Sequence, residues 1–345
     1  MKKTYSLNKD LLLSSLIPLG IALIIPLVFI IVFSNDPATT LLTFFKGPWS
    51  NLWFSGNTLD SMALLLTAAL GAVVAFRGGC FNLGGEGQIY LGGCAAAIVL
   101  LNKNTLPGPF MLLSAAVAAS AAGAVMGGVC GLLRKKTRAS ELITSFLLAA
   151  SLIPVGDHLI SSVFRSPGMN LLATDKFSSD RVLPNILPPS SLSLSIIFAL
   201  VLIFLFQFFL RRTATGYRFH IAGAAPDLAL FAGIDADKRF VPAMAVSGAL
   251  AGFAGFFAVA GTYGMCYQGF SAGLGWNGIA LALIAGNEPL LLLPVVFVFG
   301  SIKAGASAVI LQSGFGFETA AFIESAILLL AALPFGSRYL QGRSL

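Results

Sequence analysis

The sequence is poor in charged residues. Only 10% of its 345 residues are Asp, Glu, Lys or Arg, against about 25% in an ordinary globular domain, while 57% are apolar or aromatic. So little polar surface cannot face water on all sides, which excludes a soluble domain. The net charge of +7 does not indicate a nucleic-acid partner, because the Lys and Arg residues lie between apolar runs rather than on one solvated face.

Groups that could act in catalysis or metal binding are also scarce. His158 and His220 are the two histidines, so a HExxH zinc site is impossible, and the sequence has neither a GxxxxGK[ST] phosphate loop nor a GxSxG nucleophile elbow. The four cysteines form no CxxC pair or metal spacing, and we expect them to be packing residues. We therefore expect no enzyme activity, no metal and no cofactor in this chain, and its driving energy must come from another subunit.

Ten apolar runs are candidates for membrane-spanning helices. They cover residues 11–33, 59–76, 87–101, 110–133, 142–164, 192–210, 240–263, 274–285, 290–311 and 320–335. The sequence thus predicts an all-α, polytopic transmembrane bundle of about ten spans, folded as a single domain, 1–345. The runs 87–101 and 274–285 are short for a full crossing and indicate broken or re-entrant helices, so nine to eleven crossings remain open.

The basic residues indicate how these spans are oriented. With a cytoplasmic amino terminus and ten spans, most of the 21 Lys and Arg residues fall on the cytoplasmic side, as the positive-inside rule requires. Both termini are then cytoplasmic. The loop 165–191 lies outside and can touch an external partner, whereas the segment 211–239 lies inside.

The segment 211–239 is too polar for a span but is strongly patterned. Pro226 suits the first turn of a helix, Asp227 favours the positive helix end, and Gly233 would end the helix. A short cytoplasmic helix is therefore predicted over about 226–232. Leu230 and Phe231 would be exposed on it, which indicates a protein partner.

Glycines and polar residues follow the second run in the string RGGCFNLGGEGQIYLGG, residues 77–93. A broken helix with polar ends is how transporters build a path through lipid. The string resembles the signature of the permeases of bacterial ABC importers for simple sugars and nucleosides, a family related to the branched-chain amino-acid permeases. The stretches 139–150, 216–234, 247–255 and 273–290 are similar to further motifs of the same family.

The resemblance implies a membrane permease subunit of an ATP-driven importer in the bacterial cytoplasmic (inner) membrane. Its expected partners are a cytoplasmic ABC ATPase that binds ATP, a second permease, either a paralogue or a second copy, and an external substrate-binding protein. Within the family the chain looks most like the larger permease of bacterial nucleoside importers. A nucleoside is thus the expected solute, and a pentose or hexose is the alternative.

Two sets of candidate site residues follow. The expected substrate path is formed by Asn82, Glu86, Gln88, Trp276 and Asn277. The alternative is structural: Glu86 would cap a helix that begins near Gly87, and Asn82 and Gln88 would satisfy the broken helix. The expected ATPase coupling residues are Arg218, His220, Gly223, Pro226, Asp227, Leu230, Phe231 and Gly233, with His220 standing where the family usually has Arg.

Two other functions remain as alternatives. A stand-alone secondary carrier would need paired ionisable groups at mid-membrane, and Asp157 with His158 is the one adjacent acid and histidine pair. An integral-membrane enzyme would need a cluster of catalytic residues at one interface, which two scattered histidines do not provide. The exposed helix at 226–232 argues against the carrier.

Overall fold

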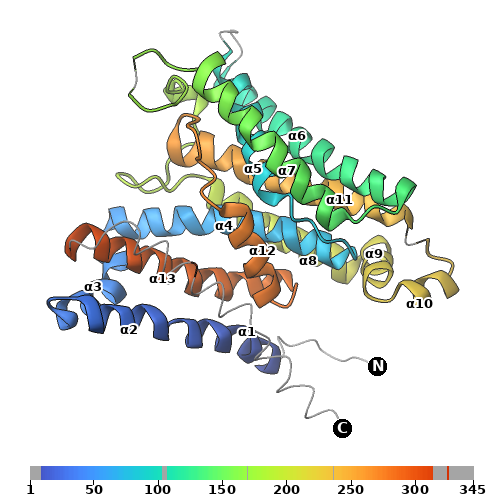
Figure 1. The fold of residues 1–345 in the computed structure, drawn as a ribbon, viewed down its shortest axis with the longest axis horizontal. Helices are drawn as coiled ribbons and strands as arrows, with labels where there is room; N and C mark the ends of the chain where they lie inside the picture. The colour runs from blue at the N-terminus through green and yellow to red at the C-terminus, as the bar shows by residue number, and fades with distance from the viewer. Residues whose placement is uncertain (1–8, 103–106, 169, 236, 314–324, 326–345) are drawn as a thin grey trace.

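The computed structural model describes residues 9–102, 107–168, 170–235, 237–313 and 325, and this part of the chain is almost entirely helical (Figure 1). Extended pairing within it is limited to two isolated bridges, Ala173 with Tyr267 and Asn185 with Ser193. The helices are α1 (Lys9–Ala22), α2 (Ile24–Phe33), α3 (Pro37–Lys46), α4 (Leu52–Arg77), α5 (Gly85–Leu101), α6 (Gly108–Thr137), α7 (Glu141–His158), α8 (Ser195–Arg212), α9 (Ala214–Ala224), α10 (Pro226–Phe231), α11 (Asp237–Phe256), α12 (Leu274–Ile284) and α13 (Leu292–Ser313).

The predicted polytopic bundle is confirmed. Seven helical segments among the described residues are long and apolar enough to cross a membrane: Leu16–Phe33, Leu52–Arg77, Gly108–Thr137, Glu141–Val163, Ser195–Arg212, Lys238–Tyr263 and Pro289–Leu311. The two short runs form α5 and α12, which are apolar but shorter helices. The last predicted run, 320–335, lies outside the described residues.

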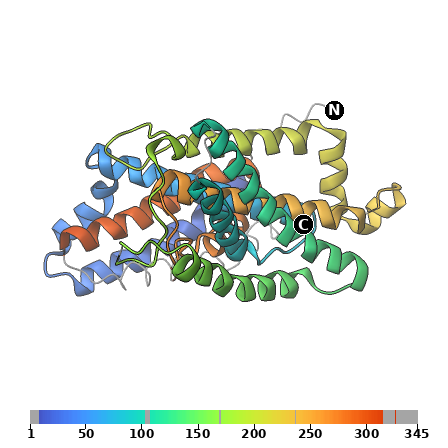
Figure 2. The ribbon, with the colours of Figure 1, turned by 90° about the horizontal axis from the view of Figure 1, so that it is seen from above.

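The helices α4 and α11 form the centre of the bundle. In the most apolar part of each, 83% of α4 and 72% of the α11 segment is buried, against 17% to 33% for the segments of α6, α7 and α8. The short helices pack on these two, α5 against α11 and α12 against α4. Figure 1 shows α9 and α10 at one end of the bundle, which we call the α9–α10 end, and Figure 2 shows the same end from above.

Glycines allow α11 to lie very close to its neighbours. A methyl group added to Gly248 would lie 2.1 Å from the carbonyl oxygen of Gly123 on α6, and one added to Gly123 would lie 2.0 Å from the Gly248 oxygen. One turn further, a methyl group on Gly252 would lie 2.1 Å from the Ala119 oxygen. Small residues four positions apart let backbones touch, which is how helices associate in a medium without a hydrophobic drive between them.

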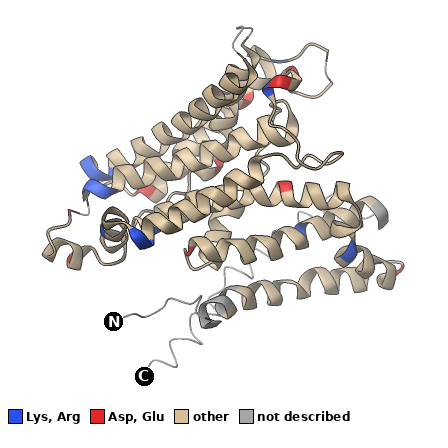
Figure 3. Cartoon of the chain, turned by 180° about the vertical axis from the view of Figure 1, so that it is seen from behind, with Lys and Arg blue, Asp and Glu red and all other residues tan. Residues whose placement is uncertain are grey.

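Basic residues gather at the α9–α10 end (Figure 3). The last turn of α6 carries Arg134, Lys135 and Lys136, and the last turn of α8 carries Arg211 and Arg212. Arg134 also lies over the ring of Phe240, 3.6 Å from its centroid, close to the start of α11. The structure therefore brings together the residues that the positive-inside prediction assigned to one side.

At the opposite end the loop 165–191 is folded rather than extended. Its backbone N–H groups donate to a second loop, Thr174 to Cys266 O and Phe177 to Gly264 O, each at 2.8 Å. The buried Asp60 of α4 fastens both regions, because it accepts hydrogen bonds from Ser191 Oγ (3.1 Å) and Thr262 Oγ1 (2.7 Å). The four cysteines are free thiols and all are buried, as expected.

We predict that Gly127→Ala destabilises the bundle while Gly128→Ala does not. A methyl group at Gly127 would lie 2.1 Å from the Met244 oxygen of α11, whereas one at Gly128 meets only Ala245 Cβ, at 3.7 Å. Overpacking of this kind costs about 1–3 kcal/mol, and both variants gain the same helix propensity. Thermal unfolding of the purified chain in detergent measures the difference, and equal midpoints would contradict the close packing of α6 on α11.

Candidate functional site

Two short helices meet near the centre of the bundle through the side chain of Glu86. Glu86 lies in the first turn of α5, and its carboxylate accepts hydrogen bonds from Ser271 Oγ (2.6 Å), Gly273 N (2.9 Å) and Gly275 N (2.7 Å). Gly273 and Gly275 belong to the amino end of α12, whose first N–H groups have no partner within the helix. The carboxylate thus satisfies these donors and lies at the positive end of the α12 dipole.

This contact corrects one prediction about Glu86. The sequence allowed Glu86 to cap the helix that begins near Gly87, but α5 begins at Gly85, and Glu86 caps α12 instead. A substrate role for Glu86 stays a prediction. In the present conformation three donors already surround the carboxylate, and its residue is 9% exposed.

Asn82 and Gln88 form a closed amide pair just before and within α5. Asn82 Nδ2 donates to Gln88 Oε1 (2.8 Å) and to Ser247 Oγ of α11 (2.9 Å), and Gln88 Nε2 donates back to Asn82 Oδ1 (3.2 Å). Asn82 Oδ1 also accepts from Gly84 N (3.0 Å). Two donors and two acceptor positions are the full capacity of an Asn side chain. This geometry favours the structural alternative for Asn82 in the present conformation.

The loop 78–84, which joins α4 to α5, is held by side chains of α6 and α7. Arg134 Nη1 donates to Gly79 O (3.0 Å), Phe81 N donates to Glu141 Oε1 (3.2 Å), and Leu83 N donates to Ser145 Oγ (3.0 Å). Arg134 and Glu141 also form an ion pair. These residues were not among the predicted site residues, although a Glu at the start of a predicted span was a usable signal.

The two remaining path candidates lie on different faces of α12. Asn277 is buried, with 3% of its surface exposed, whereas Trp276 is 43% exposed and faces out of the bundle. The Trp276 ring lies beside Phe146 of α7, with centroids 6.1 Å apart and planes tilted by 60°. The structure therefore places an open aromatic corner next to the amino end of α12.

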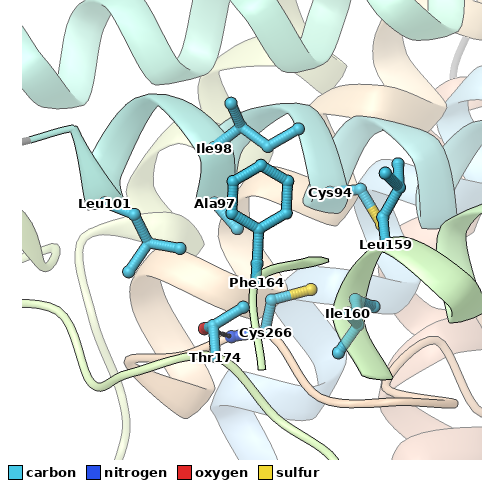
Figure 4. A pocket seen from close by; sticks show the side chains of 9 residues that line it. All are labelled: Cys94, Ala97, Ile98, Leu101, Leu159, Ile160, Phe164, Thr174 and Cys266. Atoms are coloured by element: carbon cyan, nitrogen blue, oxygen red, sulfur yellow. Dashed lines mark hydrogen bonds between the residues drawn. The ribbon is translucent and has the colours of Figure 1, made fainter. Parts of the chain in front are cut away.

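Small cavities lie beside these helices, and two of them have space for about one water molecule each. The first borders the α5–α12 contact and is lined by Ala68, Gly71, Ala72, Asn82, Gly85, Ile89, Ser247, Ala251, Gly275 and Ile279. The second, shown in Figure 4, lies under the folded loops and is surrounded by mostly apolar side chains from Cys94 to Cys266. Neither of these two cavities can hold a sugar or a nucleoside.

The adjacent acid and histidine of α7 are not paired with each other. Tyr90 of α5 donates its hydroxyl hydrogen bond to Asp157 Oδ1, and the Tyr90 oxygen accepts from Gly269 N (3.1 Å). His158 instead contacts Ser162 Oγ at 3.2 Å. The proton-exchanging pair that a secondary carrier would need is therefore not formed by these residues.

The predicted short helix is present as α10, which ends at Phe231 rather than at 232. Pro226 occupies its first turn beside Asp227, and Gly233 adopts a positive φ of 71° after it. Leu230 is 73% exposed and Phe231 is 91% exposed. This end of the molecule thus presents apolar side chains that nothing in the described chain covers.

A second helix, α9, precedes α10 and was missed by the sequence analysis. Its amino end is capped by Thr213, whose Oγ1 accepts from Gly216 N (2.9 Å), a signal that the sequence contained. Of the predicted coupling residues on it, Arg218 is exposed, whereas Gly223 packs on the loop after α4. A methyl group on Gly223 would lie 2.3 Å from Arg77 O.

His220, also on α9, lies in a cluster of charged residues. Arg77 forms an ion pair with Glu288, and Arg77 Nη1 lies 3.3 Å from His220 Nε2; Arg211 pairs with Glu288 at 3.3 Å. Burial, together with the Arg77 guanidinium, holds the pKa of His220 below its usual 6.5. The imidazole is therefore neutral at neutral pH, and it can accept a hydrogen bond from Arg77.

Comparison with known proteins places the chain among transport permeases. The family model for the permease component of branched-chain amino acid transport systems matches residues 55–332. The chain is 35% identical over 303 residues to the probable riboflavin import permease protein of Treponema pallidum, which covers 87% of this chain and 80% of that protein. No solved structure gives a significant match.

Two further relatives are less similar. The chain is 27% identical over 303 residues to the guanosine ABC transporter permease protein of Bacillus subtilis, covering 86% of each chain. It is also 27% identical over 294 residues to the nucleoside ABC transporter permease protein of Lactococcus lactis, covering 81% of this chain and 79% of that protein. The similarity therefore extends over most of the bundle.

We predict that Glu86→Gln destabilises the chain by about 1–3 kcal/mol, because the new amide donor faces backbone donors that lose a charged acceptor. Asp175→Asn is the matched control, since Asp175 is exposed in the loop 165–191 and such a change is expected to stay within about 0.5 kcal/mol. Unfolding of the purified protein by heat in detergent measures both. Equal stabilities of the two variants would contradict the role of Glu86 as the α12 cap.

Proposed function

We propose that this chain, which belongs to the family of permease components of branched-chain amino-acid transport systems, imports a nucleoside or a chemically related solute. It is a permease subunit of an ABC importer, and we place it in the bacterial cytoplasmic membrane. Two relatives are named for guanosine or nucleosides and one for riboflavin. These solutes share a flat nitrogen-containing ring system joined to a five-carbon hydroxylated group, which is a ribose ring in nucleosides and an open chain in riboflavin. A simple sugar is the alternative.

The exposed apolar end of α10 is the observation that carries the proposal of an ATP-driven importer, because it offers a contact surface for an ATPase. Leu228, Leu230 and Phe231 are 59%, 73% and 91% exposed on a helix that projects from the bundle (Figure 1). Apolar side chains gathered on a water-facing projection mark a protein contact. The partner we propose is a separate cytoplasmic ATPase, which supplies the ATP hydrolysis for transport.

The meeting of the amino ends of the short helices α5 and α12 at Glu86 supports a path for the solute at this place. Helices that end inside the membrane leave backbone groups that can bind polar solutes, and transporters use such half-helices at their binding sites. Trp276, exposed beside Phe146, offers an aromatic face on which a flat ring can stack. The adjacent cavity holds only about one water molecule, and we propose that a movement of α12 widens it for the solute.

The opposite end is suited to the remaining partners. The loop 165–191 forms a folded platform fixed by Asp60 and by backbone hydrogen bonds, and we propose that the external substrate-binding protein docks there. A second permease, a paralogue or a second copy of this chain, completes the membrane part. The α9–α10 end, with its basic residues, is then cytoplasmic.

The proposed orientation predicts the outcome of thiol labelling in intact cells. Since the native cysteines are buried, a membrane-impermeant maleimide reports on introduced ones. Ser179→Cys, in the exposed loop at the opposite end, should be labelled in intact cells. Ala232→Cys, exposed after α10, should be labelled only after the membrane is permeabilised. The reverse pattern would show that the orientation is inverted.

ATP-dependent uptake tests the function itself. The chain is reconstituted in liposomes with its ATPase, second permease and binding protein, and the uptake of labelled guanosine, riboflavin and glucose is measured with and without ATP. We expect ATP-dependent uptake of guanosine or riboflavin in preference to glucose. Uptake that is indifferent to ATP would overturn the proposal and leave a secondary carrier.

Phe231→Asp should abolish this uptake by weakening ATPase binding, since loss of an interface aromatic costs about 2 kcal/mol or more, roughly 30-fold in affinity. Phe231→Leu is the matched control, because it keeps an apolar side chain at the same position. Co-purification of the ATPase measures the binding directly. Equal binding by the two variants would exclude α10 as the docking helix.

A further inference from the structure

The helix α12 is held at both of its ends by one stretch of chain, Arg77–Glu86. The end of α4 supplies Arg77, and the start of α5 supplies Glu86. The loop 78–84 joins these two residues along the chain, and α12 itself has 11 residues, a rise of about 16 Å. The two ends of this stretch contact α12 and the turn that follows it in different ways.

The carboxyl end of α12 is fixed by Arg77. Its guanidinium pairs with Glu288, and its Nε donates to Asn287 O at 2.7 Å. The two side chains of the pair are 14% and 19% exposed, so water screens the pair only partly. The N–H groups of a guanidinium lie in one plane in a fixed fork, so Arg77 can hold Asn287 O and Glu288 together, a geometry that the compact ammonium of a lysine does not provide.

The amino end of α12 is fixed by Glu86. The three hydrogen bonds from Ser271, Gly273 and Gly275 reach its carboxylate, and the backbones also touch. A methyl group on Gly275 would lie 2.2 Å from Glu86 N. The amino end of α12 is therefore fixed to the amino end of α5, and we expect the two ends to move together.

The helix α9 contacts the stretch Arg77–Glu86 at the α9–α10 end of the bundle. Gly223 lies against the backbone of Arg77 and Gly79, and His220 lies within 3.4 Å of the Arg77 guanidinium. Arg211, at the end of α8, also reaches Glu288. The helix that leads into the exposed α10 is thus in direct contact with the residue that fixes the carboxyl end of α12.

We infer that Arg77 is a positioning residue that passes movement of α9 to α12, and so connects ATPase docking to the opening of the path. This inference rests on the proposed function. When α9 moves, Arg77 carries Glu288 and the carboxyl end of α12 with it. The loop 78–84 carries Glu86 and the amino end. The helix α12 then moves as a rigid unit. Its movement shifts Trp276 relative to Phe146 and changes the size of the small cavity beside Asn82 at the same time.

The test is the amount of solute taken up per ATP hydrolysed in the reconstituted transporter, with labelled guanosine as the probe. Arg77→Gln and Glu288→Gln should each keep the bound ATPase and its basal ATP hydrolysis but lower the uptake per ATP by about tenfold. A merely structural role would lower hydrolysis and uptake together. Arg212→Gln is the matched control, because Arg212 is an exposed neighbour at the end of α8.

Unchanged uptake per ATP in both variants would overturn the inference. If Arg77→Gln does not reach the membrane, Glu288→Gln carries the test alone, since it removes the same ion pair from the more exposed side. The exchanged pair, Arg77→Glu with Glu288→Arg, should recover part of the coupling. The wild-type protein tests the proposed function separately. If its uptake of guanosine, riboflavin and glucose does not depend on ATP, the proposed function is wrong. If uptake per ATP is lost only in the variants, the role of Arg77 as a positioning residue is supported.

Discussion

The carboxylate of Glu86 is the group on which the membrane part of the structure depends most. A charged carboxylate at the centre of a span costs about 2.5–3.5 kcal/mol on insertion scales. A half-helix that begins inside the membrane leaves N–H groups unpaired where no water can satisfy them. Each group satisfies the other here, because Gly273 N and Gly275 N donate to the Glu86 carboxylate. The amino ends of α5 and α12 therefore stabilise each other inside the bundle.

Close packing of α11 against α5 and α6 helps to position the polar groups around the Glu86 contact. The glycines of α11 let its backbone touch α6, and a methyl group on Gly92 of α5 would lie only 2.4 Å from Gly252 Cα. This position of α11 brings Ser247 to the amide of Asn82. The polar network at the helix break therefore depends on small residues elsewhere in the bundle. We propose that solute passage rearranges this network, and that the contacts of Arg77 with α9 transmit the movement.

Local sequence patterns predicted the helices, but they could not predict contacts between residues far apart in the chain. Apolar runs and the glycines at 84 and 85 were sufficient for the long apolar helices that the structure describes and for the break before α5, because a bilayer requires continuous apolar stretches. The helix α10 was predicted from Pro226, Asp227 and Gly233, whereas α3 was overlooked despite the start signal Asp36-Pro37. The partners of Glu86 could not be found in this way. Gly275 is 189 residues away, and no periodicity reports on which helix end a carboxylate will meet. Contact of Trp276 and Asn277 with a solute stays a prediction.

The proposed mechanism requires α12 to move when nucleotide binds to the partner ATPase. The most direct measurement is the distance between spin labels at Leu283→Cys on α12 and Val125→Cys on α6, both exposed positions, in the reconstituted complex with and without ATP. The native thiols are buried and should not react. We expect the distance to change in the wild-type background and to stay constant when Arg77→Gln is introduced. A distance that stays the same in the wild type when ATP is added would contradict the proposed mechanism.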